Sequence, residues 1–558
     1  MTRSLAAACA LGILVAIVAG DEGHAGDVDP GPIVSLSIVP GAQAIAVGDR
    51  LHLAVVARHE DGSVEDLARA ARWRSSAVSV TRVGRGGNVT GRSRGSATIT
   101  ASVDGARAAT TVSVGSRSLG PLRVSTANPR YFVDATGRVV YLAGDHTWSN
   151  LQDNGTSDPP PRFDYTGFLE SLQTHDLRVF RLWSWEQASR TGEIRGDYFF
   201  SPTVYVRTGP GKATDGKPRF DLRRFDPAYF ERLRRRVVEA RERGIYVIVM
   251  LFDGWSVERK GDGDNPWTGH PYNRANNVNG VDGDRDGNGS GEETHTLAEP
   301  EVLRLQEAYV ARVLRAVGDQ PNVLYEVSNE SSPGSMPWQN RIVGFVRAHE
   351  RPARRQPVGI TAEYPDGRNA DLLASVGDWI APNGDANDPD PSTGRKIVFA
   401  DTDHLCGVCG DTGFPWRALT RGLNPMFMDP WDGKAIGLGA LGRDANDPRW
   451  EVMRRRLGVT VALSEHLDLA RLVPRADLCS TRFCLADPKR GTQYVVYLPR
   501  GDSSVTLDLS ASRSRLRATW VDPDTGVGEP GGTVAGGGTR SLRAPGGGDA
   551  VLVLRAGS

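Results

Sequence analysis

The sequence predicts a multidomain protein in which a central (β/α)8 TIM barrel is flanked by two small β-sandwiches. Three observations predict this fold class. Apolar strand patterns alternate with amphipathic helical patterns over residues 121–475. The flanking segments, 32–115 and 476–558, contain short alternating strands and turn residues but no long helical pattern. The length of 558 residues also suits about three or four domains.

An open doubly wound sheet is the alternative for the central segment. Such a sheet commonly carries a glycine-rich phosphate-binding loop at the start of its first helix. We find no such loop in residues 121–475. The barrel is therefore the favoured prediction.

The composition indicates a globular protein without a charge bias. Hydrophobic residues make up 39% and charged residues 24% of the chain, and 67 basic residues balance 67 acidic ones. Net charge therefore gives no reason to expect a nucleic-acid partner. Arginine-rich stretches at 232–243 and 454–457 alternate with apolar residues at helical spacing, which predicts the solvated faces of barrel helices.

The N-terminus predicts export. Arg3 precedes an apolar run that is short for a membrane span, and small residues follow it near Gly20. Residues 1–20 are therefore predicted to be a signal peptide, and the Gly- and Asp-rich residues 21–31 a linker. A retained membrane anchor is the alternative. We expect no other transmembrane segment, and we expect the protein to be secreted or held at the cell surface.

Four cysteines remain after removal of the signal peptide. They are Cys406, Cys409, Cys479 and Cys484. An even number in an exported chain predicts disulfides, and the local pairs Cys406–Cys409 and Cys479–Cys484 are the simplest connectivity. A four-cysteine zinc site is the alternative.

Residues 32–115 carry the motifs "VGDRLHLAVVARHEDGS", "ARWRSSAVSVTRV" and "GNVTGRSRGSATITAS". In these motifs the segment resembles the bacterial Ig-like domains of group 2. The resemblance implies a β-sandwich with Trp73 as its central core residue. It also implies a spacer or adhesive module, which would attach the protein to a cell surface, rather than a catalytic one.

The barrel prediction rests on eight strand patterns in order, most of them separated by helical patterns. The strand patterns lie at 141–148, 178–186, 245–255, 322–330, 357–364, 378–383, 396–404 and 424–431. The helical patterns lie at 163–177, 226–244, 299–319, 337–351 and 449–472. From about Cys479 the helical signal stops, and strand patterns lead to the C-terminus.

Polar and aromatic residues collect where these strands end. The carboxyl ends of barrel strands converge on one mouth, so these side chains are expected to share a site. The predicted substrate-binding residues are Asp145, His146, Trp148, Arg181, Trp183, Trp185, Asn329, Tyr364, His404 and Trp431. Glu186, Asp253, Trp255, Glu363, Asn383 and Asp429 also occupy strand ends.

Aromatic rings together with several carboxylates suit a sugar substrate. Trp rings pack on the C–H faces of sugars, and glycosidic cleavage needs two carboxyl groups. Glu330, at the end of the fourth strand, fits the proton donor. Asp401 is the first choice for its partner because it follows the apolar run directly, and Asp403 is the second.

The motifs "YLAGDHTW", "NVLYEVSNE" and "VFADTDHL" resemble the clan of retaining glycoside hydrolases that has an Asn-Glu acid/base on strand four. Within that clan, residues 121–558 look like the apiosidase-like and collagen-binding barrel proteins. The resemblance implies a glycoside hydrolase that acts on a poly- or oligosaccharide and needs no cofactor. The usual strand-seven nucleophile is Glu, whereas this chain offers Asp, which leaves retention or inversion open. A non-catalytic carbohydrate- or matrix-binding protein is the alternative.

The loop after the third strand predicts a calcium site. Asp282, Asp284, Asp286 and Glu293, with Gly287 between them, have the spacing of a calcium-binding loop. The ion would have a structural role. A solvated acidic loop is the alternative.

Overall fold

The computed structural model describes residues 31–39, 41–46, 50–92, 95–115, 119–190, 197–260, 265–350, 352–409, 411–431 and 446–557. The predicted signal peptide and residues 21–30 of the predicted linker lie outside the described residues. The chain divides into two compact units, one that ends at Val112 and one that continues from Ser113 to the C-terminus. Each unit is described by itself.

The N-terminal unit consists of short β-strands in three sheets. The first sheet consists of β1 (Ile33–Val39), β4 (Ala54–His59) and β5 (Val64–Asp66). The second consists of β2 (Gln43–Ala46), β10 (Ala106–Gly115), β9 (Gly95–Val103) and β6 (Arg72–Ser75). The third consists of β3 (Arg50–His52), β8 (Asn88–Gly91) and β7 (Thr81–Val83). Leu53, Val55 and Ile99 are fully buried. The prediction for Trp73 was wrong, because its ring is only half-buried. Its indole N–H donates to Ala68 O at 2.8 Å, and aliphatic side chains fill the core instead.

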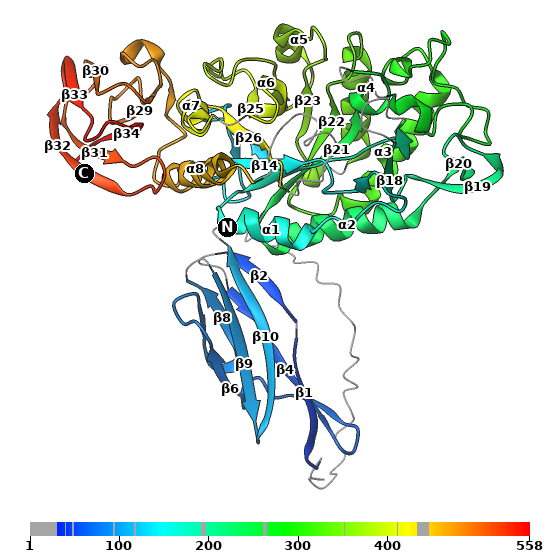
Figure 1. Ribbon diagram of the computed structural model, residues 1–558. Helices are drawn as coiled ribbons and strands as arrows, with labels where there is room; N and C mark the ends of the chain where they lie inside the picture. Colours follow the sequence, from blue (N-terminus) through cyan, green and yellow to red (C-terminus); the bar gives the residue numbers. More distant parts are fainter. Residues whose placement is uncertain are drawn as a thin grey trace. The chain divides into compact units, whose positions relative to one another are not determined.

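The centre of the second unit is a closed barrel of eight parallel strands, as predicted (Figure 1). The strands are β14 (Gly144–Thr147), β16 (Val179–Leu182), β21 (Tyr246–Asp253), β22 (Val323–Asn329), β23 (Val358–Thr361), β24 (Trp379–Ala381), β25 (Ile397–Asp401) and β26 (Asn424–Met428). Each lies within one of the eight predicted patterns. The strands are buried along their whole length, which explains why the patterns read as apolar runs.

Helices surround the strands. They are α1 (Tyr165–Thr174), α2 (Pro227–Glu242), α3 (Pro300–Val317), α4 (Met336–His349), α5 (Asn369–Ala374), α6 (Thr402–Leu405), α7 (Phe414–Thr420) and α8 (Pro448–Ser464). Asp226 caps α2 by accepting a hydrogen bond from Ala228 N, and Pro227 occupies the first turn, where no N–H is needed. No helix is found in the described stretch between β24 and β25.

The arginine-rich helices are only partly solvated, which corrects the prediction. Arg234 is exposed and pairs with Asp319, as expected for a solvated face. Arg236, Arg454 and Arg456 are buried. The guanidinium of Arg236 lies 4.4 Å from the centre of the Tyr165 ring. These arginines link neighbouring elements rather than facing solvent.

Smaller β elements complete the barrel unit. They are β11 (Arg123–Val124), β12 (Phe132–Val133), β13 (Val139–Val140), β15 (Asp153–Gly155), β17 (Ser189–Arg190), β18 (Tyr198–Ser201) and the hairpin β19 (Tyr205–Lys212) with β20 (Pro218–Phe225). Short 3₁₀ turns lie at Gly254–Ser256, Pro266–Gly269 and Glu292–His295. All three follow β21, so the described parts of the long loop after the third strand, 254–260 and 265–299, contain regular turns.

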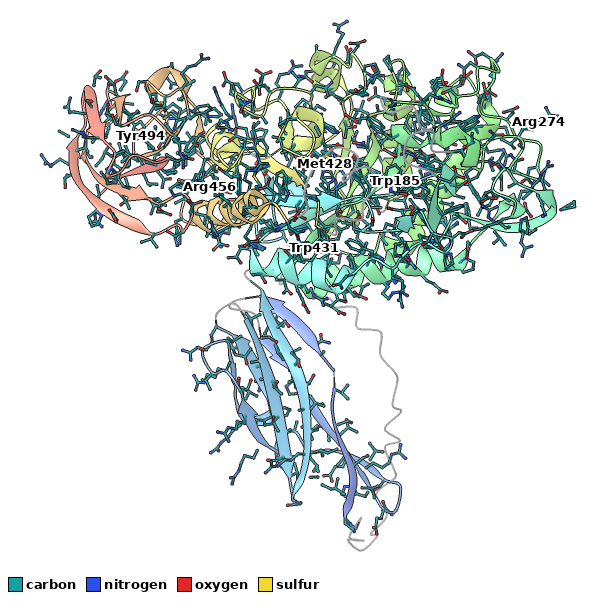
Figure 2. The ribbon with its side chains drawn as sticks, in the orientation of Figure 1. Trp185, Arg274, Met428, Trp431, Arg456 and Tyr494 are labelled. Atoms are coloured by element: carbon teal, nitrogen blue, oxygen red, sulfur yellow. A yellow bond between two sulfur atoms is a disulfide. The ribbon has the colours of Figure 1, made fainter. Side chains whose placement is uncertain are left out.

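The C-terminal strands form two sheets. Strands β27 (Val473–Pro474), β28 (Cys484–Ala486), β29 (Gln493–Leu498), β34 (Ala550–Ala556), β31 (Arg515–Val521) and β32 (Gly528–Ala535) make the larger one, and β30 (Ser504–Asp508) pairs with β33 (Thr539–Arg543). Arg456 of α8, labelled in Figure 2, bonds to Asp524 and Asp549, each at 2.7 Å. These half-buried ion pairs attach the sheets to the barrel helices.

The cysteine prediction holds for one pair. Cys406 and Cys409 form a disulfide, whereas Cys479 and Cys484 are free and buried. Cys479 Sγ contacts Thr481 Oγ1 at 3.4 Å, and Cys479 and Cys484 are close enough to shift each other's pKa, so local sequence brings them together without a covalent bond. The zinc alternative finds no support, because the only grouping of three potential metal ligands in the described ranges contains no cysteine. Among these residues no helix combines the length and apolar character that a membrane span requires.

Candidate active site

Arg181 is the centre of the polar groups at the barrel mouth. It comes from β16 and is 2% exposed. Its Nε lies 2.9 Å from Glu326 Oε2, one terminal nitrogen lies 3.0 Å from Asp401 Oδ2, and the other lies 3.7 Å from Asp403 Oδ2. Burial lowers the pKa of Arg181, but these carboxylates outweigh it and hold the pKa above its usual value. One cation therefore serves three acids.

Asp401 is fully engaged by its neighbours. His146 Nε2 lies 3.0 Å from its Oδ1, which also accepts the Asp403 N–H at 3.0 Å and so caps α6. Its Oδ2 faces Arg181. Burial raises the pKa of Asp401, but Arg181 and His146 together hold it well below its usual range. Asp401 is thus a permanent anion that fixes the site, and little of it is left to contact a substrate.

Asp403 is the freer of the two aspartates. Its side chain is 12% exposed, and its contacts to Arg181 and His404 are long, at 3.7 and 3.9 Å. Burial, followed by the negative charges of Glu330 and Asp401, raises its pKa well above the usual range. The charge of Glu330 acts more strongly on it than that of Asp401. Asp403, the second choice from the sequence, is therefore the less engaged of the two candidate partners of Glu330.

Glu330 lies just beyond β22 in a strained backbone conformation. Its φ of 42° is in the left-handed region that non-glycine residues rarely adopt. Its Oε2 accepts a hydrogen bond of 2.5 Å from Trp255 Nε1. Burial raises the pKa of Glu330 to about 7 although Trp255 and two cations oppose the shift. A carboxyl group of this kind can hold and release a proton near neutral pH.

Asn329 connects the fourth strand to its neighbours. Its Oδ1 lies 2.9 Å from His404 Nε2 and 3.4 Å from an Arg181 terminal nitrogen. Its Nδ2 donates to Asp253 Oδ1 at 3.4 Å, and Asn329 is in register with Asp253 across β21 and β22. Burial lowers the pKa of His404 to about 3, so this imidazole is neutral. The amide is thus oriented by donors from strands two and seven.

Three tryptophans and His146 form an aromatic wall. His146 stacks on Trp183 with ring centres 5.3 Å apart, and Trp183 lies 5.7 Å from Trp185 and 6.1 Å from Trp148. Trp185 Nε1 donates to Trp148 O at 2.8 Å. The indole N–H groups of Trp148 and Trp183 are buried and have no hydrogen-bond partner within the described part of the chain. The predicted aromatic residues of strands one and two are therefore together.

A second aromatic pair lies beside Glu330. Trp255 and Tyr364 stack with ring centres 5.8 Å apart and an interplanar angle of 25°. Tyr364 is 38% exposed, whereas Trp255 is half-buried. The pair thus connects the buried Glu330 side chain to the protein surface.

Two predicted substrate residues have other contacts. Burial and the charge of Asp429 raise the pKa of Asp145 well above its usual range. Asp429 in turn makes two 2.6 Å bonds to Arg454 of α8. The ring contacts of Trp431 are with Phe168 of α1 and with Arg454. These side chains join the first and last strands to the helices around them.

Sequence reasoning missed two charged residues of the site, Glu326 and Lys260. Glu326 is fully buried in β22 beside Arg181, and burial raises its pKa to about 7. A carboxylate inside an otherwise apolar strand was the signal that could have found it. Lys260 offered no such signal, because it follows the third strand in a loop without a motif.

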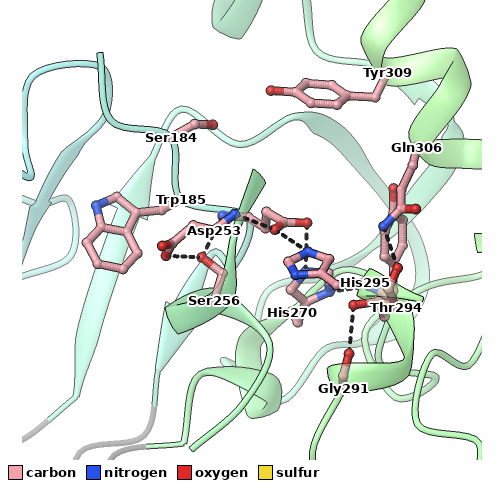
Figure 3. A network of polar contacts seen from close by, with 12 residues as sticks. Ser184, Trp185, Asp253, Ser256, His270, Gly291, Thr294, His295, Gln306 and Tyr309 are labelled. Atoms are coloured by element: carbon pink, nitrogen blue, oxygen red, sulfur yellow. Dashed lines mark hydrogen bonds and ion pairs between the residues drawn. The ribbon is translucent and has the colours of Figure 1, made fainter. Parts of the chain in front are cut away.

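Glu186 belongs to a buried histidine cluster rather than to the carboxyl pair. His270 and His295, shown in Figure 3, lie 3.6 and 3.0 Å from its oxygens. Its Oε1 also accepts the Asp253 N–H at 3.0 Å. Burial opposes the shift, but the histidines lower the pKa of Glu186 to about 2. This cluster anchors the loop after β21 to the end of β16.

The acidic loop gathers three of the four predicted calcium ligands. Carboxylate oxygens of Asp284, Asp286 and Glu293 lie within 4.8 Å of one another. Asp282 is not part of this group, and its Oδ1 accepts a hydrogen bond from Asp284 N at 3.3 Å. Glu293 Oε2 is buried without a hydrogen-bond partner among the residues described. Three hard oxygen donors fit a calcium ion that completes its shell with backbone oxygens or water.

Comparison with known proteins relates the chain to glycoside hydrolase structures. No protein family model matches the sequence, and no curated protein matches it. A solved glycoside hydrolase covers 78% of this chain and 97% of its own, with 12% identity and a TM-score of 0.50. A family 5 glycoside hydrolase from Bacteroides vulgatus covers 78% and 93%, with 12% identity and a TM-score of 0.53. The barrel fold is shared with these enzymes. A presumed glycoside hydrolase from the same organism covers 92% of this chain and 100% of its own, with 14% identity and a TM-score of 0.53.

Proposed function

We propose that the protein is an exported glycoside hydrolase that cleaves an O-glycosidic bond of a poly- or oligosaccharide. The observation that carries the proposal is the pair Glu330 and Asp403. Glu330 is buried and Asp403 is 12% exposed, and the charge of Glu330 helps to raise the pKa of Asp403. A pair of carboxyl groups with raised pKa values beside aromatic rings is what glycosidic cleavage requires.

The two acids take different roles because their surroundings differ. Interacting carboxyls titrate as a pair, and one proton between them gives one acid and one base. Arg181 lies 3.7 Å from Asp403 Oδ2 and acts more strongly on Asp403 than on Glu330. Arg181 favours the ionised form of Asp403, although burial and the charges of Glu330 and Asp401 raise the pKa of Asp403 well above its usual range. We assign the transferred proton to Glu330 because Glu330 occupies the acid/base position of the clan that the sequence resembles.

Bond cleavage then follows from these protonation states. Glu330 donates its proton to the leaving glycosidic oxygen as the C–O bond breaks. Asp403 supplies the electron pair at the anomeric carbon, either directly as a nucleophile or by taking a proton from an attacking water. Asn329 bonds to a sugar hydroxyl, and the Trp148–Trp183–Trp185 wall packs against the sugar ring. Asp401 holds Arg181 and His146 in place.

Release of sugar from a broad panel of plant and bacterial polysaccharides and aryl glycosides tests this proposal. Wild type, Glu330→Gln, Asp403→Asn and Asp401→Asn are compared at equal concentration. We expect wild type to release sugar and both Glu330→Gln and Asp403→Asn to lose that activity. Binding of a glycan by wild type without any release would overturn the enzymatic proposal.

A non-catalytic carbohydrate- or matrix-binding protein is the second candidate. The aspartate on strand seven favours this binding function, because the clan that the sequence resembles uses glutamate at that position. A binding protein would retain the same glycan affinity in Glu330→Gln and wild type and would turn over none of the panel.

Further proposals concern the rest of the chain. Residues 1–20 direct export, and the N-terminal unit is an Ig-like spacer that holds the protein at a cell surface. The barrel and C-terminal sheets belong to the apiosidase-like group within the clan. Calcium at Asp284, Asp286 and Glu293 has a structural role beside the active site, and catalysis itself uses no cofactor.

A further inference from the structure

Lys260 is a buried ammonium group next to the proposed proton donor. Its side chain is 1% exposed. Its Nζ donates to Glu330 O at 2.9 Å, to Tyr364 O at 2.7 Å and to Ser332 Oγ at 3.4 Å. Glu258 Oε1 lies 3.7 Å away, and the other oxygen of this carboxylate, Oε2, accepts a hydrogen bond from Ser332 Oγ. The ammonium thus binds mainly neutral oxygens, although burying a cation is costly.

The backbone oxygens that Lys260 binds belong to the two strand ends that flank the donor carboxyl. Glu330 follows β22, and Tyr364 follows β23. The Glu330 peptide is held on its other side as well, because its N–H donates to Thr361 Oγ1 at 3.2 Å. Gly254 permits the close approach of the third strand, since a Cβ there would lie 2.1 Å from Glu330 O. Lys260 therefore holds the carbonyl of the residue whose backbone is strained.

We infer that Lys260 is a positioning residue for the proton donor: its ammonium holds the Glu330 peptide in its left-handed conformation and electrostatically favours the ionised carboxyl. The inference rests on the proposed function for its catalytic meaning. This role explains why a cation is buried here, because Glu330 buried without the ammonium of Lys260 would release its proton only at higher pH.

Other charges also face Glu330. Arg181 from β16 favours its ionised form, whereas Asp401 at the end of β25 and Asp403 in α6 disfavour it. Glu258 and Asp253 face Lys260 itself and favour its charged form. Arg181 is shared among three other acids, whereas Lys260 bonds directly to the Glu330 peptide. Removal of Lys260 should therefore shift the titration of Glu330 upward.

Titration of Glu330 by ¹³C NMR tests the inference without a substrate. The full chain is labelled at the glutamate side-chain carboxyl carbons, and Glu330→Gln assigns the signal. Lys260→Met removes the charge, and Lys260→Gln removes it while keeping an N–H donor, which covers the case in which the first variant does not fold. Lys396→Met is the matched control, because Lys396 Nζ also binds backbone carbonyls, at Ser375 and Gly377, but lies at the start of β25.

We expect the midpoint of the Glu330 titration to rise by about one pH unit in the neutral Lys260 variants and to stay in place in Lys396→Met. With a hydrolysed substrate, the alkaline limb of kcat/KM should move by the same amount. A midpoint that is unchanged in the Lys260 variants, or that moves equally in Lys396→Met, would overturn the inference. The NMR midpoint does not depend on turnover. The proposed function can therefore fail in the glycan panel while the Lys260 variants still shift the Glu330 midpoint, and the midpoint can stay unchanged while the glycan panel supports hydrolysis.

Discussion

Asp401 and His146 are joined by a 3.0 Å hydrogen bond in which neither side chain is accessible, with exposures of 1% and 0%. The bond separates the roles of the two strand-seven aspartates. Asp401 is committed to His146, Arg181 and the α6 N-terminus, whereas the Asp403 side chain is 12% exposed and makes only long contacts to Arg181 and His404. We therefore propose that Asp401, which directly ends the apolar strand, supports the site, and that Asp403, two positions later, acts in it.

The first prediction contrasts Asp401→Asn with Asp403→Asn. Loss of Asp401 leaves part of the charge of Arg181 buried without its partner, which should cost about 3–5 kcal/mol of unfolding free energy. Loss of Asp403 should change stability much less and should lower kcat on the order of 10³-fold or more. Urea denaturation and steady-state kinetics measure the two effects.

An external nucleophile provides the control for the comparison of Asp401 with Asp403. Azide should restore turnover of an activated aryl glycoside in Asp403→Gly if Asp403 is the nucleophile, and it should not do so in Asp401→Gly. Rescue at Asp401 alone would reverse the assignment.

The second prediction concerns the pH dependence of stability. Burial raises the pKa of Glu330 from 4.5 to about 7, so between these values the folded protein binds more protons than the unfolded chain. The contribution of Glu330 to the free energy of unfolding is therefore fully present below about pH 4.5 and is lost as the pH rises through about 7. Glu330→Gln should accordingly raise Tm at pH 8 relative to wild type by more than it does at pH 5.

Glu350 provides a matched control for this effect. Burial also raises its pKa to about 7, but it caps the C-terminal end of α4 and accepts the Gln356 N–H, away from the carboxyl pair. Glu350→Gln should also raise Tm at pH 8 by more than it does at pH 5, and it should leave sugar release unchanged. An equal loss of activity in both variants would contradict a specific role for Glu330.

The third prediction concerns the acidic loop. Removal of calcium by a chelator should lower Tm, and re-addition of calcium should restore it, because the ion binds only the folded state. Asp284→Ala should abolish this response, whereas Asp282→Ala should retain it, since Asp282 is outside the cluster. A Tm that is insensitive to chelation in wild type would favour the solvated loop.

The fourth prediction concerns the cysteines. Alkylation under denaturing, non-reducing conditions should label Cys479 and Cys484 and leave Cys406 and Cys409 unlabelled. Peptide mass spectrometry gives the answer directly. Labelling of none of the four would restore the sequence expectation of two disulfides.

The eight barrel strands could be predicted because each is a short apolar run that is buried on both faces and ends in polar residues. The proposed donor, Glu330, could be singled out in the same way, since it directly follows such a run. The choice between Asp401 and Asp403 was not accessible, because it depends on where α6 begins and on which side chains reach each carboxylate. Lys260 was missed for a related reason: its partners are backbone oxygens, which leave no pattern in the sequence.

The most direct test of the central claim is release of reducing sugar from the glycan panel by wild type, Glu330→Gln and Asp403→Asn. We predict that wild type hydrolyses at least one glycan and that each variant retains binding but loses hydrolysis on the order of 10³-fold or more. Full hydrolysis by either variant, or binding without hydrolysis by wild type, would contradict the account.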